Sequence, residues 1–315
     1  MMTAAVRRED AGRAGRVVVL GSANADLVVE VPRRPGAGET LLGSDLRVFA
    51  GGKGANQAAA AARCGASTAL IACVGDDGNG MLVRRALADA GVDVGAIASV
   101  GRPTGTALIL VTPDGENSIV VSPGANHALD VSVAQVTEER WAGAGVLALN
   151  LETPLATVEH VAVRAAERGV RVLVNAAPAH PLSAATLAVC DPVVVNEHEA
   201  RILAGDGGDR SFEELARDLL VRGARSVVIT LGAAGALHAD VDGVGRVPAH
   251  AVDVVDTTGA GDAFVGAMAC ELARGAVLRD AVAFATAVAA ISVRSMGAQA
   301  SYPDRAEVER MLTGA

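Results

Sequence analysis

The sequence predicts a three-layer α/β/α fold with a mostly parallel central sheet and a small β lid. From residue 69 onward, short apolar runs alternate with helix-like segments, and repeated strand–helix units build parallel sheets with helices on both faces. Hydrophobic residues make up 51% of the 315 residues and aromatic residues only 2%. The interior is therefore expected to consist of Ala, Val, Leu and Ile, as in covered parallel sheets.

The main sheet and its helices follow from runs of apolar residues bounded by turn residues. Its expected strands are 17–20, 69–74, 146–150, 170–175, 193–196 and 226–231. The expected helices are 54–64, 80–90, 155–168, 197–204 and 212–222, with two more after residue 256. The apolar run 281–293 is expected to be a buried helix. Residues 1–15 are expected to form a flexible tail and residues 16–315 a single domain, because no Pro/Ser-rich boundary divides them.

Four further strands break the strand–helix alternation. They are 27–31, 40–49, 106–111 and 118–122. The last two are expected to form a hairpin around Pro113-Asp114-Gly115. We expect a separate small sheet from roughly residues 24–50 and 104–123, folded over the strand ends as a lid.

Charge and apolar patterning exclude several functions. A net charge of −9 argues against nucleic acid as a partner, because nothing neutralises phosphates in bulk. The longest apolar run, 281–293, is too short to span a bilayer, and the charged N-terminus does not resemble a signal peptide. The four cysteines are scattered without a CxxC pair, which favours reduced thiols in a cytoplasmic protein. They are Cys64, Cys73, Cys190 and Cys270.

The most informative stretch is DTTGAGDAF at 256–264. Gly259, Ala260 and Gly261 leave backbone amides accessible at an expected helix N-terminus, where an anion is favoured. Asp262 places a carboxylate base beside these donors, and a base next to an anion hole suits phosphoryl transfer. A glycine turn with Asp262 helping to cap the helix is the structural alternative.

A second glycine-rich segment, GGKGANQA at 51–58, also opens an expected helix. Gly52 permits close approach of a ligand to the backbone, while Lys53 and Asn56 supply polar contacts. It is not a P-loop, because Gly54 stands where Ser or Thr should follow the lysine. A glycine-rich helix start with a solvated lysine remains the alternative.

Polar residues follow several expected strands, where ligands bind in α/β folds. Asn24 and Asp26 could bind the vicinal hydroxyls of a sugar, and Glu152 and Asn196 each follow another strand. Thr230 with Gly232 could hold phosphates. Each residue could instead form a cap or a turn, but together they suggest a polar crevice along one sheet edge. Zinc-site spacing, a GxSxG motif and a full GxGxxG fingerprint are absent.

Taken together, these motifs resemble the ribokinase family of carbohydrate kinases over residues 17–303. GSANAD, GGKGANQA, GDDGNG, GENSIVVSPGAN, NEHEA, TLGAAG and DTTGAGDAF occur in the family's order. The resemblance implies phosphorylation of D-ribose at its 5-hydroxyl by ATP and Mg²⁺, with K⁺ as a second ion. It also implies a homodimer that pairs through the lid.

The resemblance implies a role for each matching position. Asp262 would be the base, and Gly259, Ala260 and Gly261 would form the anion hole. The sugar would contact Asn24, Asp26, Gly52, Lys53, Asn56, Glu152 and Asp262. The nucleotide would contact Asn196, Thr230, Gly232, Gly261 and Thr286, and Glu199 would help to organise Mg²⁺ indirectly. The K⁺ site would comprise Asp256, Thr258, Ser292, Ser295, Gly297 and Ser301.

Two departures from the family's pattern leave the nucleotide preference open. Ala176 replaces a proline, and Thr286 stands where Asn or His is often found. Another sugar or nucleoside (deoxyribose, fructose, adenosine or pseudouridine) is the alternative substrate. A sugar-sensing protein without catalysis is the distant alternative from another class, although the sequence retains Asp262 and both glycines.

Overall fold

A nine-stranded sheet forms the centre of the computed structural model, which describes residues 15–114, 117–136 and 138–314. Its order is β13-β12-β11-β10-β9-β8-β1-β4-β5. The strands are β1 (Arg16–Leu20), β4 (Ser67–Gly75), β5 (Ile97–Val100), β8 (Val146–Asn150), β9 (Arg171–Asn175), β10 (Cys190–Asn196), β11 (Val227–Thr230), β12 (Ala236–Asp240) and β13 (Gly243–Val247). All neighbours are parallel except at the edge, where β12 and β13 run antiparallel. The predicted fold class is confirmed.

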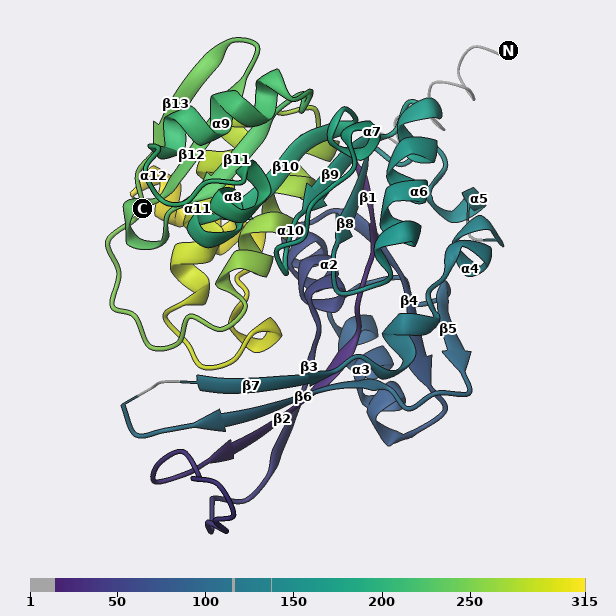
Figure 1. Ribbon diagram of the computed structural model, residues 1–315, viewed down its shortest axis with the longest axis vertical. Helices are drawn as coiled ribbons and strands as arrows, with labels where there is room; N and C mark the ends of the chain where they lie inside the picture. The colour runs from purple at the N-terminus through teal and green to yellow at the C-terminus, as the bar shows by residue number, and fades with distance from the viewer. Residues whose placement is uncertain (1–14, 115–116, 137, 315) are drawn as a thin grey trace.

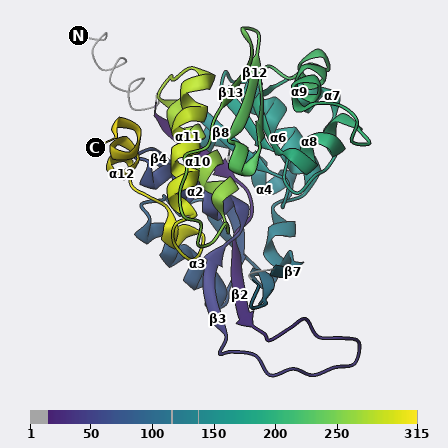
Figure 2. The ribbon, with the colours of Figure 1, turned by 90° about the vertical axis from the view of Figure 1, so that its left-hand side faces the viewer.

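Helices cover both faces of this sheet, so the molecule has three layers (Figures 1 and 2). One face carries α2 (Lys53–Arg63), α3 (Gly78–Asp89), α10 (Ala260–Ala273), α11 (Leu278–Ser292) and α12 (Arg305–Thr313). The other carries α4 (Val131–Val136), α5 (Glu138–Trp141), α6 (Leu155–Glu167), α7 (Ala184–Leu187), α8 (Glu197–Ala204) and α9 (Phe212–Val221).

The side chains of β1 show how one apolar strand serves both layers. Val17 and Val19 pack into the core beneath α2 and α10, whereas Val18 and Leu20 pack into the core beneath α6. Successive strand residues point to opposite faces, and all four side chains are fully buried. The continuous apolar run that predicted a buried strand is thus explained by two covered faces.

The apolar run 281–293 lies within α11, apart from its last residue, and most of it is buried against α10 and the sheet, as predicted. Among the described residues, no helix has the length and apolar character needed to cross a membrane. All four cysteines are buried and unpaired.

A second sheet of four strands projects from the main body (Figure 1). Its order is β3 (Arg47–Gly51), β2 (Asn24–Glu30), β6 (Gly105–Val111) and β7 (Asn117–Ser122). The predicted hairpin is present as β6 and β7, but Gly115 and Glu116 of its turn lie outside the described residues, as does the predicted tail up to residue 14.

The strand predicted over 40–49 begins later than expected. Its counterpart β3 starts at Arg47, where pairing with Val28 of β2 begins. Leu42 is 92% exposed and lies before the paired part of the strand. Apolar and β-branched composition alone therefore did not predict where pairing starts, because pairing depends on the partner strand.

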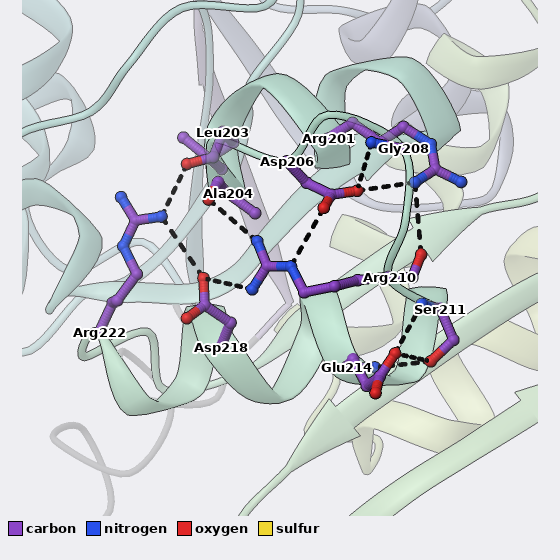
Figure 3. A network of polar contacts seen from close by, with 10 residues as sticks. All are labelled: Arg201, Leu203, Ala204, Asp206, Gly208, Arg210, Ser211, Glu214, Asp218 and Arg222. Atoms are coloured by element: carbon purple, nitrogen blue, oxygen red, sulfur yellow. Dashed lines mark hydrogen bonds and ion pairs between the residues drawn. The ribbon is translucent and has the colours of Figure 1, made fainter.

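A network of arginines and aspartates ties the C-terminal end of α8 to α9 (Figure 3). Asp206 is the centre: it accepts hydrogen bonds from Arg201 at 2.8 Å, Arg210 at 3.2 Å and the Gly208 backbone at 3.1 Å. Arg201 also lies over the Phe212 ring, 4.9 Å from its centroid. Because Asp206 is nearly buried yet fully paired, it holds α8 in place, and the N-terminal end of α8 contributes to the site described next.

Candidate active site

The polar crevice predicted at one sheet edge is formed by the carboxyl ends of parallel strands. β1, β8, β9, β10 and β11 are parallel neighbours, so their C-terminal ends meet at the same edge. Glu152 follows β8, while Asn175, Asn196 and Thr230 end β9, β10 and β11. The N-terminus of α10 carries Asp262 to this edge.

The start of α10 is held in an unusual turn. Gly259 has φ 74°, and a Cβ there would lie 2.6 Å from that of Ala298. Tyr302 donates from its hydroxyl to the Gly259 carbonyl at 3.0 Å. A Cβ at Gly261 would instead meet no atom within 4 Å, so this residue leaves open space in front of the helix. Only glycine satisfies the first position without strain.

The three amides predicted to form an anion hole are not equivalent. The Ala260 amide donates to the Thr257 carbonyl at 3.2 Å. No backbone acceptor is found in the described part of the chain for the amides of Gly259 and Gly261. These two donors, together with the positive end of the α10 dipole, are the ones free to bind an anion.

Asp262 is buried, and side-chain amides reach both of its carboxylate oxygens. Asn56 donates to Oδ2 at 3.1 Å and Gln57 to Oδ1 at 3.0 Å. Gln57 also donates to Asn175 at 3.0 Å, while Gln299 donates to Asn56 at 3.0 Å. Sequence reasoning missed Gln57, although it directly follows Asn56 in the glycine-rich segment. The predicted role of Asn56 could have pointed to the polar side chain next to it.

A cavity of about 140 Å³ opens beside Asp262. Its lining comprises Lys53, Asn175, Ala177, Val194, Val195, Asn196, Glu199, Thr230, Gly259, Gly261, Asp262 and Val265. Most residues predicted to contact the nucleotide or Mg²⁺ are thus brought together with the predicted base. Gly232, in the short helix η2 (Gly232–Ala234), is exposed near the end of β11.

Thr286 is not part of this lining. Its side chain is buried in α11, where its hydroxyl donates to the Val282 carbonyl at 2.8 Å. The hydroxyl is thus satisfied within its own helix.

Asn196 and Glu199 form a capping box at the start of α8. The Asn196 side chain accepts from the Glu199 amide and the Glu199 carboxylate from the Asn196 amide, both at 2.8 Å. Burial raises the pKa of Glu199, although the Asn196 amide and Lys53 oppose the rise. Local sequence therefore fixes both side chains at the cavity wall.

Several of the residues predicted to bind sugar meet near Asp262. Burial, then the charges of Glu152 and Asp262, raises the pKa of Asp26 to about 7. Glu152 accepts from the Ser22 hydroxyl at 2.5 Å and the Lys53 amide at 3.1 Å. The negative charge of Asp262 raises the pKa of Lys53, against the effect of burial.

Gly52 allows this group to assemble. It has φ 88°, and a Cβ would lie 2.8 Å from the backbone nitrogen of Asn24. The close approach of these two backbone segments requires glycine.

The residues predicted for K⁺ lie on two adjoining loops. Asp256 accepts from the amides of Thr258 at 2.9 Å and Gly297 at 2.8 Å. Burial raises its pKa, but the Thr258 side chain and these two amides together outweigh burial and lower it. Ser292 and Ser301 donate their hydroxyls to carbonyls of their own turns. The set offers one carboxylate with hydroxyl and carbonyl oxygens, which suits a hard monovalent cation. Within the described residues, no cluster of three or more His, Cys, Asp or Glu could hold a metal ion.

Comparisons with known proteins show which family the chain resembles. The family model described as pfkB family carbohydrate kinase matches residues 14–305. A ribokinase of Haemophilus influenzae is 41% identical over 299 residues, covering 94% of this chain and 98% of that protein. A deoxyribokinase of Salmonella typhi is 34% identical, covering 94% and 98%. The structure of an Arabidopsis thaliana ribokinase complexed with ribose and ATP superposes with a TM-score of 0.85 at 32% identity, covering 95% and 98%.

Proposed function

The chain belongs to the pfkB family of carbohydrate kinases and is a phosphotransferase of the ribokinase type, and we propose that it transfers the γ-phosphoryl group of ATP to the 5-hydroxyl of D-ribose. The observation that carries the proposal is the position of Asp262. It borders the cavity lined by Asn196 and Thr230, and its charge also acts on Asp26, beside Glu152.

In this proposal Asp262 accepts the proton of the attacking hydroxyl. Its oxygens are aimed by Asn56 and Gln57, so the base is held in one orientation. The amides of Gly261 and Gly259, together with the dipole of α10, stabilise negative charge on the transferring phosphoryl group. The Ala260 amide contributes once its hydrogen bond to the Thr257 carbonyl is broken. Positioning and charge stabilisation are what this reaction needs, since no covalent intermediate is required.

The nucleotide would lie in the cavity beside Asp262. Asn196, Thr230 and Gly232 would follow its phosphates, and Lys53 would bring a positive charge between sugar and phosphate. Mg²⁺ would be organised near Glu199, whose buried carboxylate faces the cavity. The ion supplies neutralisation of phosphate charge when bound. Thr286, proposed to face the purine, lies outside the cavity lining, and its hydroxyl donates to the Val282 carbonyl within α11.

The proposed K⁺ site would act on the anion hole without touching phosphate. Asp256 joins the loop before α10 to the loop around Gly297. Thr258, Ser292, Ser295, Gly297 and Ser301 would supply the remaining oxygens. A cation there would order the turn that carries Gly259 and Gly261.

The small sheet would act both as a lid and as a dimer surface. Its apolar side chains remain exposed: Val48, Phe49, Leu108, Ile119, Val120 and Val121 are 36–65% accessible. An exposed apolar sheet with two free edges favours association with a second copy. Closure of the same sheet over the sugar would exclude water, which otherwise competes for the phosphoryl group.

Analysis of the product tests the proposal directly. The protein, D-ribose, ATP and Mg²⁺ are incubated with K⁺, and the phosphorylated carbon is identified by ³¹P–¹H correlation NMR. Phosphate on carbon 5 supports the proposal, whereas phosphate on carbon 1 overturns the assigned orientation of the sugar. The similarity to a deoxyribokinase makes 2-deoxyribose the alternative substrate, and a strong preference for it would replace ribose in the proposal.

A further inference from the structure

Asn126 connects the end of the small sheet to Asn24, one of the residues proposed to bind sugar. It has no role in the reaction described above. It belongs to the short helix η1 (Gly124–Ala128), which follows β7, and its side chain is 1% exposed. Its Oδ1 accepts from the Ala23 amide at 2.9 Å, and its Nδ2 donates to Asn24 Oδ1 at 2.6 Å. The side chain therefore contacts the segment that enters β2.

These two contacts determine the orientation of both amide side chains. A backbone N–H can only donate, so the oxygen of Asn126 must face Ala23. The nitrogen of Asn126 then faces Asn24, whose oxygen must accept. Asn24 is left with its Nδ2 group directed away from Asn126. No protein partner for that nitrogen is found in the described ranges.

The pair occupies space beside Gly105. A Cβ on Gly105, which pairs with Asn24 in the small sheet, would lie 2.3 Å from both Asn126 Nδ2 and Asn24 Oδ1. The two amides thus fill the space that a glycine leaves. Asn24 and Asp26 are two residues apart on one strand and share a face of it, so Asn24 stands beside a carboxyl group.

We propose that Asn126 is a positioning residue that sets the sugar specificity of the site by making Asn24 a hydrogen-bond donor. This rests on the proposed function, in which Asn24 contacts the sugar. Asn24 then donates a hydrogen bond to one sugar oxygen, while Asp26 and Asp262 accept hydrogen bonds from sugar hydroxyls. A sugar that lacks an oxygen at this position leaves the Asn24 donor unpaired and therefore binds less well.

Asn126→Asp tests the inference because it is nearly isosteric but removes the donor. One carboxylate oxygen keeps the Ala23 contact, and the other can only accept. Asn24 must then turn over, donate to it, and present its oxygen to the sugar. We expect the KM for ribose to rise about tenfold or more, with the KM for ATP and kcat within about twofold.

Fluorinated sugars test whether Asn24 donates or accepts the hydrogen bond to the sugar. Fluorine accepts a weak hydrogen bond and cannot donate one. If fluorine replaces the hydroxyl that Asn24 contacts, the deoxyfluoro sugar should therefore bind the native protein better than the corresponding deoxy sugar. The 2- and 3-substituted pairs of ribose are compared. The difference should vanish in Asn126→Asp, which a merely structural defect would not produce. Asn117→Asp makes the same change at an exposed position of β7 and should leave every value unchanged.

Gly105→Ala provides a second variant that alters no charge. Its methyl group would displace the Asn24–Asn126 pair, and we expect the same selective rise in the KM for ribose. An unchanged KM for ribose in folded Asn126→Asp would overturn this inference but not the proposed function. The same would follow if the KM for ribose and the KM for ATP rose, and kcat fell, by equal factors. Failure of the native protein to phosphorylate any sugar would overturn the proposed function and this inference with it.

Discussion

Asp262 accepts a hydrogen bond from a side-chain amide at each carboxylate oxygen, yet it still borders the cavity. A carboxylate held in this way needs no reorganisation before it accepts a proton. Asp262→Asn keeps the shape and removes the base. We expect kcat to fall by about 10²- to 10⁴-fold with little change in the affinity for ATP, measured by ADP release and nucleotide titration. Turnover close to that of the native protein would contradict the assignment of Asp262 as base.

Gly261 allows a test of the anion hole that spares the fold. Because a Cβ there meets no other atom, Gly261→Val should fold normally while its side chain occupies the space in front of the amide. We expect activity to be lost with an unchanged melting temperature. Gly78→Val is the matched control, since Gly78 is also an exposed residue in the first turn of a helix with open space around its Cβ position. Full activity of Gly261→Val would exclude this anion hole.

Asp26 gives the free protein a pH dependence. Its pKa is raised from 3.8 to about 7 in the folded protein, so the folded state binds the proton more tightly than the unfolded state. The resulting stability is present below about pH 4 and is lost as the pH rises through 7. Asp26→Asn removes the titration. Its melting temperature relative to the native protein, without sugar or nucleotide, should rise between pH 5 and pH 8.5, and a constant or falling difference would be inconsistent with the raised pKa.

At the scale of elements, two loops make the start of α10 sensitive to the proposed cation. Asp256 connects them through Gly297, so Asp256→Ala should require a higher K⁺ concentration for half-maximal activity, measured by titrating KCl against a constant ionic strength. Asp253→Ala changes an exposed carboxylate in the same loop and should behave as the native protein. A native protein whose activity never depends on K⁺ would show that the cation site is assigned wrongly.

Elements with strong local patterns were predictable from the sequence, and those that depend on partners were not. The apolar run 17–20 and the helix 197–204, which begins with a capping box, are confirmed. β12 and β13 were missed. β13 is a half-buried edge strand that contains two glycines, and β12 is only five residues long, with His238 and Asp240 among its apolar residues. β3 was placed too early, because its start depends on where β2 can pair.

The same distinction applies to the candidate site. Asp262, Asn196 and Thr230 were predicted from positions where strands end and a helix begins, and they line one cavity. Gln57 and Asn126 could not be predicted in the same way. Their roles depend on contacts with residues about 205 and 103 positions away in the chain. The individual roles of these residues stay predictions.

At the scale of the whole molecule, the small sheet is the surface through which two copies should associate. Leu108 and Val120 are direct cross-strand neighbours and are 50% and 65% exposed. Replacing both by Ser should shift a dimer to monomers in analytical ultracentrifugation, since it removes apolar area from the proposed contact. Val241→Ser, at a turn where the side chain is 96% exposed, is the control and should leave the dimer intact. A native protein that is monomeric at micromolar concentration would contradict the proposed dimer.

Whether this kinase acts on ribose is tested most directly by comparing its kcat/KM for several substrates. ADP release is measured with ATP, Mg²⁺ and K⁺ for D-ribose, 2-deoxyribose, fructose, adenosine and pseudouridine, each over a range of concentrations. We predict that kcat/KM for D-ribose exceeds the others by a wide margin. A higher kcat/KM for another of these compounds, or no ADP release with any of them, would contradict the account.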